Sequence, residues 1–272
     1  MTQFAQPAPV TCYIRTQNEE RMIGRVIEAA KAVADEIVVV DSGSSDRTIE
    51  IAESLGARVI RQPWLGNGPQ KRVGEDAAKH DWLLDLDADE ILTPKLAEEI
   101  RQLFAHGEPP KPIYEFKLIT APPVGEPWWD FLHAYRRKLY DRRVIRIPDH
   151  KAWDQFEVPS GVPIGRLKGD VLHYSFRDFA HVAEKMNKVS TVRSRESKLK
   201  ARWQTEVRVW FGLPFYFFKH FIMRGLWRGG TYGVVLSALA AHGRWLRDAK
   251  MYEIHLNREA ETKKAAREER AA

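Results

Sequence analysis

The 272-residue sequence contains a single cysteine, Cys12. One thiol excludes an internal disulfide and is consistent with a reducing compartment. The N-terminus has no basic segment followed by an apolar run, so no secretory signal is expected. The most apolar stretches, 209–223 and 232–241, are interrupted by Gly, Pro, Lys or His and are too short to span a bilayer. We therefore expect a cytoplasmic protein that can rest on the inner face of the cytoplasmic membrane.

Two nucleotide-binding motifs are also missing. No Gly-x-Gly-x-x-Gly follows the first predicted strand, which excludes a Rossmann dinucleotide site, and no Walker lysine motif occurs. Charge is plentiful, with 43 Lys and Arg against 37 Asp and Glu, and from Arg193 onward the cations are interleaved with aromatic residues. Such a surface can meet nucleic acid, anionic lipid or a phosphorylated glycan. Because no nucleic-acid-binding module is recognisable, an anionic membrane is the expected partner and nucleic acid is not.

Apolar runs alternate with segments of helical period over the first ninety or so residues. The predicted strands are 10–14, 37–40, 57–60 and 82–86, and the predicted helices are 22–33, 48–55 and 69–79. This alternation predicts an α/β fold with a doubly wound, mostly parallel sheet, whose ligands bind beyond the carboxyl ends of the strands. Further on, a helix over 94–104 is followed by short strands at 113–119, 138–140, 164–168 and 171–174, and by helices over 179–200 and 211–256.

An acidic cluster follows the fourth predicted strand. Asp85, Asp87 and Asp89 stand at alternate positions, with Glu90 beside the last. Alternate residues of a strand share a face, so these carboxylates repel one another unless a cation or a proton relieves the repulsion. Oxygen ligands favour Mg²⁺ or Mn²⁺, and Mg²⁺ commonly combines one or two carboxylates with substrate phosphate oxygens. The alternative is a polar loop whose acids cap a helix starting near Thr93, and the cluster alone leaves both interpretations open.

A second polar loop follows the predicted strand 37–40. Asp41 opens a turn of small polar residues that ends at Asp46. An acid here can accept a hydrogen bond from a ribose hydroxyl or a pyrimidine imide, and small residues admit a nucleotide. Helix capping by Ser44, Ser45 or Asp46 would explain the turn but not Asp41. Together with the polar loop 15–20 and the acidic cluster, this turn lies at one sheet edge, which is the predicted site.

Three segments carry a resemblance to a known family. Residues 11–20, 38–48 and 86–90 resemble the signature segments of family 2 inverting glycosyltransferases with the GT-A fold. The resemblance implies that Asp41 contacts the nucleotide base or ribose, and that Asp87 and Asp89 hold a divalent ion on the diphosphate of a sugar nucleotide. It implies nucleotide-sugar contacts at Thr16, Asn18, Glu19, Asp41, Gly43, Lys71 and Asp87, and Mn²⁺ or Mg²⁺ ligands at Asp87, Asp89 and His173. Asp85 would support them.

The second half of the chain resembles the lipopolysaccharide-core β-glucosyltransferases. The likeness rests on segments 138–140, 165–175 and 185–188. In that subgroup a His-Glu pair precedes the Gly-Asp-x-x-His-Tyr segment, whereas here Phe156 replaces the histidine. The resemblance makes Glu157 the first candidate for the base that deprotonates the acceptor, with Asp154 as the alternative. His173 is either a metal ligand or a core histidine.

These likenesses imply a metal-dependent inverting glycosyltransferase. The expected reaction moves a hexose, glucose from UDP-glucose, to a lipopolysaccharide-core or other lipid-linked acceptor. A sugar-phosphate nucleotidyltransferase and a non-catalytic membrane-surface adaptor with a degenerate nucleotide site are the alternatives. The expected organisation is a flexible tail (1–9), a GT-A catalytic domain (10–177, with a nucleotide-sugar half 10–105 and an acceptor half 106–177), a helical, aromatic and basic extension (178–257) and a charged tail (258–272).

Overall fold

The computed structural model describes residues 7–122, 133–151 and 153–271. These residues form two compact units, which we call the sheet unit (7–175) and the helical unit (176–271). Most of the tail expected at 1–9 and most of the Pro- and Trp-rich loop 122–129 lie outside the described residues. The first strand begins at Ala8, inside the segment expected to be a tail.

The first half of the sheet unit alternates strands and helices as predicted. The strands are β1 (Ala8–Thr16), β2 (Ala34–Asp41), β3 (Arg58–Arg61) and β4 (Trp82–Asp87), and the helices are α1 (Ile23–Lys31), α2 (Thr48–Ser54) and α3 (Asn67–Ala77). β3, β2, β1 and β4 are parallel neighbours in that order. The apolar runs of β1, β2 and β4 are buried because helices cover both faces of a parallel sheet. The predicted α/β fold with a doubly wound sheet is confirmed.

The second half extends the same sheet with mixed pairing. Its elements are β5 (Glu90–Leu92), α4 (Pro94–Phe104), β6 (Ile113–Thr120), β7 (His133–Asp141) and β8 (Ile164–His173). The full order among the described strands is β3-β2-β1-β4-β7-β6-β8-β5, in which β6 and β8 are parallel and the other added pairs are antiparallel. Strand β5 was not predicted. The two predicted strands 164–168 and 171–174 form one continuous strand, so that prediction was wrong.

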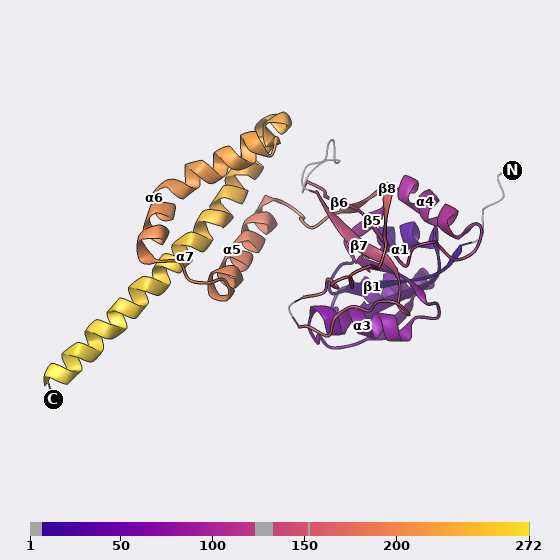
Figure 1. Cartoon of the computed structure of the whole chain (residues 1–272), viewed down its shortest axis with the longest axis horizontal. Helices are drawn as coiled ribbons and strands as arrows, with labels where there is room; N and C mark the ends of the chain where they lie inside the picture. The colour runs from indigo at the N-terminus through magenta and orange to yellow at the C-terminus, as the bar shows by residue number, and fades with distance from the viewer. Residues whose placement is uncertain (1–6, 123–132, 152, 272) are drawn as a thin grey trace. The chain divides into compact units, whose positions relative to one another are not determined.

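The core lies in two layers, one on each face of the sheet. Helices α1 and α4 cover one face and α3 lies on the other (Figure 1). In α1 the buried residues Ile23, Val26, Ile27 and Ala30 recur at helical spacing and meet β1 and β2. On the opposite face Tyr13 and Tyr140 pack in the second cluster, and their hydroxyl groups lie 2.7 Å apart.

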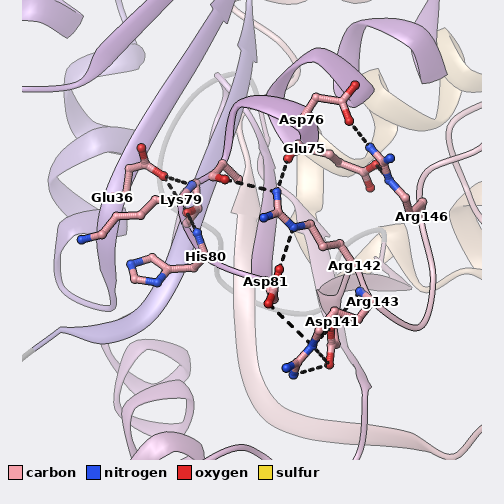
Figure 2. A network of polar contacts seen from close by, with 12 residues as sticks. Glu36, Glu75, Asp76, Lys79, His80, Asp81, Asp141, Arg142, Arg143 and Arg146 are labelled. Carbon is pink, nitrogen blue, oxygen red and sulfur yellow. Dashed lines mark hydrogen bonds and ion pairs between the residues drawn. The ribbon is translucent and has the colours of Figure 1, made fainter.

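A network of polar contacts closes the sheet edge at which β4 begins and β7 ends (Figure 2). Arg142 donates to Asp81 at 3.0 Å and to the backbone carbonyl of Glu75 at 2.7 Å. The buried Glu75 carboxylate accepts from Arg146 at 2.9 Å and from the Tyr140 hydroxyl at 2.6 Å. Because these groups are mutually paired, this edge has a structural role. The loops that carry the predicted site residues lie at the opposite edge of the sheet.

The helical unit contains α5 (Phe179–Glu196), α6 (Arg202–Phe218), a π-helical turn η1 (Lys219–Met223), a 3₁₀ turn η2 (Leu226–Gly229) and α7 (Gly230–Ala271). Both α5 and α6 run along α7 (Figure 1). The single helix predicted over 211–256 is therefore wrong, because two turns and the left-handed Gly225 separate α6 from α7. The expected charged tail continues α7. No described helix is long and apolar enough to cross a membrane.

Candidate active site

A cavity of about 370 Å³ opens at the carboxyl end of β4. Strands β4, β5, β6, β7 and β8, helix α3 and the segment after residue 153 supply its walls. Among the described residues, the lining consists of Lys71, Asp87, Glu90, Leu118, Thr120, His133, Ala134, Arg136, Lys138, Asp154, Gln155 and His173. The cavity therefore contains four of the predicted site residues, namely Lys71, Asp87, Asp154 and His173.

Two members of the acidic cluster, Asp85 and Glu90, are neutralised by buried lysines. Lys71 Nζ lies 2.7 Å from Asp85 Oδ2, and Lys138 Nζ lies 2.6 Å from Glu90 Oε2. Burial disfavours the charged lysines, but the surrounding carboxylates, Asp85 first, outweigh it and raise the pKa of both Lys71 and Lys138. The repulsion predicted for these carboxylates is thus relieved by lysines at Asp85 and Glu90.

Helix capping does not explain the acidic cluster. The N-cap of α4 is Thr93, whose hydroxyl accepts from the Leu96 N–H at 3.3 Å, and the first turn of α4 contains no acid. Glu90 instead belongs to β5, where its carboxylate accepts from the Asp87 N–H at 3.0 Å. Glu90 therefore fixes the tight turn between β4 and β5 that carries Asp87 and Asp89.

The other two members of the cluster, Asp87 and Asp89, each pair with a different residue. Asp87 Oδ1 lies 2.9 Å from Arg15 Nη2, since β1 and β4 place these two residues in register. Burial would raise the pKa of Asp87, but Lys71 and Arg15 outweigh it and lower that pKa. Asp89 Oδ2 lies 3.2 Å from His173 Nε2, because β8 pairs with β5 beside the turn and the Tyr174 N–H donates to the Asp89 carbonyl.

The predicted metal ligands are partly assembled. Among residues 7–122, 133–151 and 153–271, no three His, Cys, Asp or Glu side chains form a group that could hold a metal ion. Asp89 and His173 nevertheless present one carboxylate and one imidazole side by side, whereas Asp87 is engaged by Arg15. A divalent cation that takes one or two protein carboxylates together with phosphate oxygens fits this donor pair.

The other two polar loops meet at the same sheet edge. The Asn18 side chain accepts from the Ser45 N–H at 2.8 Å, and the Glu19 N–H donates to Thr48 Oγ1 at 2.8 Å. Asn18 adopts a left-handed backbone conformation, with φ of 53°, that directs the loop toward residues 41–46. Their proximity follows from β1 and β2 being parallel neighbours whose carboxyl ends lie together.

Asp41 shapes its own turn. Its carboxylate accepts from the backbone N–H groups of Gly43 and Ser44, both at 2.9 Å, and only 1% of the residue is exposed. Gly43 has a φ of 99°, a region that favours glycine. Thr16 is buried nearby, and its hydroxyl has no hydrogen-bond partner among the described atoms.

The two candidate bases occupy different environments. Asp154 lines the cavity, and its carboxylate lies 3.1 Å from Lys71 Nζ and 3.8 Å from Arg15 Nη1. Burial would raise the pKa of Asp154, but Lys71 outweighs it and lowers that pKa. Glu157 is exposed and does not belong to the described lining. That Glu157 is the base stays a prediction.

Helix α3 positions the segment that carries Asp154. The Asn67 N–H donates to the Lys151 carbonyl at 2.8 Å, and the Gly68 N–H donates to the His150 carbonyl at 3.1 Å. A Cβ atom at Gly68 would lie 2.0 Å from the Pro148 carbonyl oxygen, so only glycine permits this approach. The same helix carries Lys71, which therefore reaches Asp85 and Asp154 together.

Two charged site residues, Arg15 and Lys138, were not predicted, and the role of Glu90 in the predicted acidic cluster was left open. Arg15 forms an ion pair with Asp87, which lines the cavity. Lys138 and Glu90 both line the cavity and form an ion pair with each other, although they are far apart in the sequence. The only available signal was a cation or acid placed next to an apolar strand. That signal identifies a candidate but does not identify its partner.

Comparison with known proteins agrees with this architecture. Residues 11–146 match the family described as glycosyl transferase family 2. A protein of Rickettsia bellii named as an uncharacterised glycosyltransferase is 32% identical over 91% of this chain and 87% of its own length. LpsC of Rhizobium meliloti, a lipopolysaccharide core biosynthesis glycosyltransferase, is 29% identical over 91% of this chain and 93% of its own length.

Among solved structures, glucosyl-3-phosphoglycerate synthase from Mycobacterium tuberculosis, crystallised with Mn²⁺, UDP and glucosyl-3-phosphoglycerate, superposes with a TM-score of 0.42 at 20% identity, covering 69% of this chain and 80% of that one. Similarity at this level does not assign the ligands of that protein to this chain. The family match, which spans half of the chain, and the Rickettsia bellii relative, which is 32% identical over most of both lengths, decide the family. The chain belongs to the family 2 glycosyltransferases and, as an enzyme of that family with the GT-A fold, transfers a glycosyl group.

Proposed function

We propose that this enzyme is a metal-dependent inverting hexosyltransferase that uses a UDP-sugar donor, UDP-glucose first. The observation that carries the proposal is the Asp89 and His173 pair beside a cavity whose charges are already balanced. Three cations of the lining, Lys71, Arg136 and Lys138, are matched by the three carboxylates Asp87, Glu90 and Asp154. A diphosphate entering this cavity needs additional positive charge, and a divalent ion supplies it.

The donor site extends from the turn at Asp41 to the cavity. Asp41 and the adjoining loop 15–20 would hold the nucleoside, since both lie at the carboxyl ends of parallel strands, where such folds bind nucleotides. Mn²⁺ or Mg²⁺ bound by Asp89 and His173 would neutralise the diphosphate leaving group. Lys71 also lines the cavity, where its ammonium pairs with Asp85 and Asp154.

Inversion requires a base on the face of the sugar opposite the diphosphate. The base accepts the proton of an acceptor hydroxyl, whose oxygen bonds to the anomeric carbon while the nucleoside diphosphate leaves with the electron pair of the broken bond. We assign this role to Asp154, because its carboxylate lines the cavity and Glu157 does not. Lys71 keeps Asp154 ionised, which is the form that accepts the proton.

The acceptor is proposed to be a lipopolysaccharide-core or other lipid-linked glycan. Support comes from LpsC, whose name assigns it to lipopolysaccharide core biosynthesis and which this chain matches over most of both lengths. Family membership supports transfer over the nucleotidyltransferase and adaptor alternatives. Release of pyrophosphate from a nucleoside triphosphate and a sugar phosphate would favour the nucleotidyltransferase instead.

The test is a screen of sugar nucleotides by thermal stabilisation with and without Mn²⁺, followed by calorimetry on the best donor. We expect UDP-glucose to bind only with the metal present, and Asp89→Ala to abolish that binding. Glu53→Ala, which removes an exposed acid on α2, is the matched control and should bind like the parent. Metal-independent binding, or unchanged binding by Asp89→Ala, would contradict the proposal, and the anomeric configuration of the product tests inversion.

A further inference from the structure

Helix α6 turns its large aromatic side chains away from the helix that it packs on. The exposed fractions are 65% for Trp203, 79% for Trp210, 68% for Phe211, 58% for Phe215 and 55% for Phe218. We call these five residues the α6 aromatic face. A helix of a water-soluble protein ordinarily buries such side chains against its neighbours.

The opposite side of α6 packs on α7 with small and polar residues. Its buried residues are Thr205, Gly212 and Tyr216. The Tyr216 hydroxyl donates to Asp248 at 2.5 Å, and Trp245 of α7 donates to the Val209 carbonyl at 2.9 Å. These contacts fix the rotation of α6, so its aromatic face stays outward as a consequence of packing.

Positive charge predominates in the segment that carries this face. Between residues 202 and 228 the sequence has one acid, Glu206, against the five cations Arg202, Arg208, Lys219, Arg224 and Arg228. Glu206 is paired with Arg202 at 2.8 Å, and Arg202 also contacts Glu259. The cations that follow α6, in η1, in η2 and between them, therefore keep most of their charge for an external partner.

We propose that the α6 aromatic face is an interfacial anchor for an anionic phospholipid membrane. Trp and Phe rings on one side of a helix, flanked by Lys and Arg, suit the boundary between headgroups and acyl chains. At a rise of about 1.5 Å per residue, a 17-residue helix lying flat covers about 25 Å of membrane surface. The excess of cations selects an anionic bilayer over a second copy of the same basic face, which would repel it.

This membrane contact goes beyond the transfer reaction and requires neither its donor nor its metal. It would, however, place the enzyme at the surface that presents a lipid-linked acceptor. Vesicle binding is measured without any sugar nucleotide. Failure of the proposed reaction therefore leaves the membrane inference untouched, and failure of vesicle binding leaves the reaction untouched.

The test is flotation of the full chain with vesicles of phosphatidylcholine containing phosphatidylglycerol, compared with phosphatidylcholine alone. We expect binding to the anionic vesicles that weakens as salt is raised. Trp210→Ser combined with Phe211→Ser should weaken it by about 100-fold or more, since each buried aromatic ring contributes about ten-fold. Lys219→Gln combined with Arg224→Gln should weaken it by about ten-fold and reduce its salt dependence.

Leu256→Ser provides a control, because it removes an exposed apolar side chain of α7 outside this face. That variant should bind vesicles like the parent chain. The inference is overturned if the parent does not float, if the α6 double variant floats unchanged, or if binding is equal on neutral vesicles. It is also overturned if light scattering shows a dimer that the Trp210 and Phe211 substitutions dissociate, since the face would then join two copies.

Discussion

The Lys71 ammonium donates to Asp85 at 2.7 Å, and both side chains are only 1% exposed. The same ammonium lies 3.1 Å from Asp154, at the cavity. A single buried cation therefore links the carboxylate that supports the sheet edge to the carboxylate that we propose as the base. We therefore expect the stability of the fold and the position of the proposed base to depend on the same buried cation.

Replacing Asp85 by Asn keeps the shape of the side chain and removes its charge. Lys71 and Lys138 then remain buried with fewer partners, and an uncompensated buried charge costs about 3 to 5 kcal/mol. We expect the free energy of unfolding, measured in urea, to fall by about that amount. Asp76→Asn breaks a partly exposed pair with Arg146 and should cost about 1 kcal/mol or less. Equal effects of the two substitutions would refute this account.

The two candidate bases are separated by matched amide variants. A general base contributes about 100- to 10,000-fold to the rate, so Asp154→Asn should lower kcat by about 100-fold or more. Glu157→Gln should change kcat by less than about three-fold, because Glu157 is exposed outside the described lining. Steady-state kinetics with saturating donor make the comparison. The reverse order of effects would assign the base to Glu157.

Gly68 tests whether α3 positions the site. An alanine Cβ would lie 2.0 Å from the Pro148 carbonyl oxygen, which forces α3 and residues 148–151 apart. We expect Gly68→Ala to destabilise the fold by about 1 to 3 kcal/mol, and to lower kcat/KM by about ten-fold or more because Lys71 and Asp154 separate. Gly24→Ala, whose Cβ would meet only side-chain methyl groups, of Ile51 at 3.3 Å and Leu55 at 3.7 Å, is the control. Full activity of Gly68→Ala would show that this contact does not position the site.

Local periodicity was enough to predict the first seven elements of the sheet unit to within a few residues. It failed where a residue acts through a distant partner. Two strands, 164–168 and 171–174, were predicted, but β8 is continuous across Gly169, and a Cβ at Gly169 would lie 2.4 Å from the Leu96 backbone of α4. The glycine permits close packing of a helix on the strand and does not form a turn.

In the site, too, the local features were predictable and the distant partners were not. The meeting of loops 15–20 and 41–46 was predictable, because parallel neighbouring strands end at one edge of the sheet. The partners of the acidic cluster were not predictable. Lys71 and Lys138 are separated from Asp85 by 14 and 53 residues, and no local pattern specifies which charges meet across such distances. A sequence thus indicates where a site forms before it indicates how its charges are paired.

His220 provides a pH-dependent test within the helical unit. It lies in η1, its Nδ1 atom is buried without a hydrogen-bond partner among the described atoms, and burial together with Arg224, Lys219 and Arg244 lowers its pKa to about 4. An unfolded histidine titrates at about 6.5, so between these values the unfolded chain binds a proton that the folded chain does not. Stability should therefore fall as pH decreases from about 6.5 to about 4, by about 1 to 2 kcal/mol after allowing for the partial exposure of the ring.

Hydrogen exchange of amides in 202–223 in the full chain, without vesicles, measures this loss against His220→Gln. A variant with the same pH dependence as the parent would mean that another group is responsible.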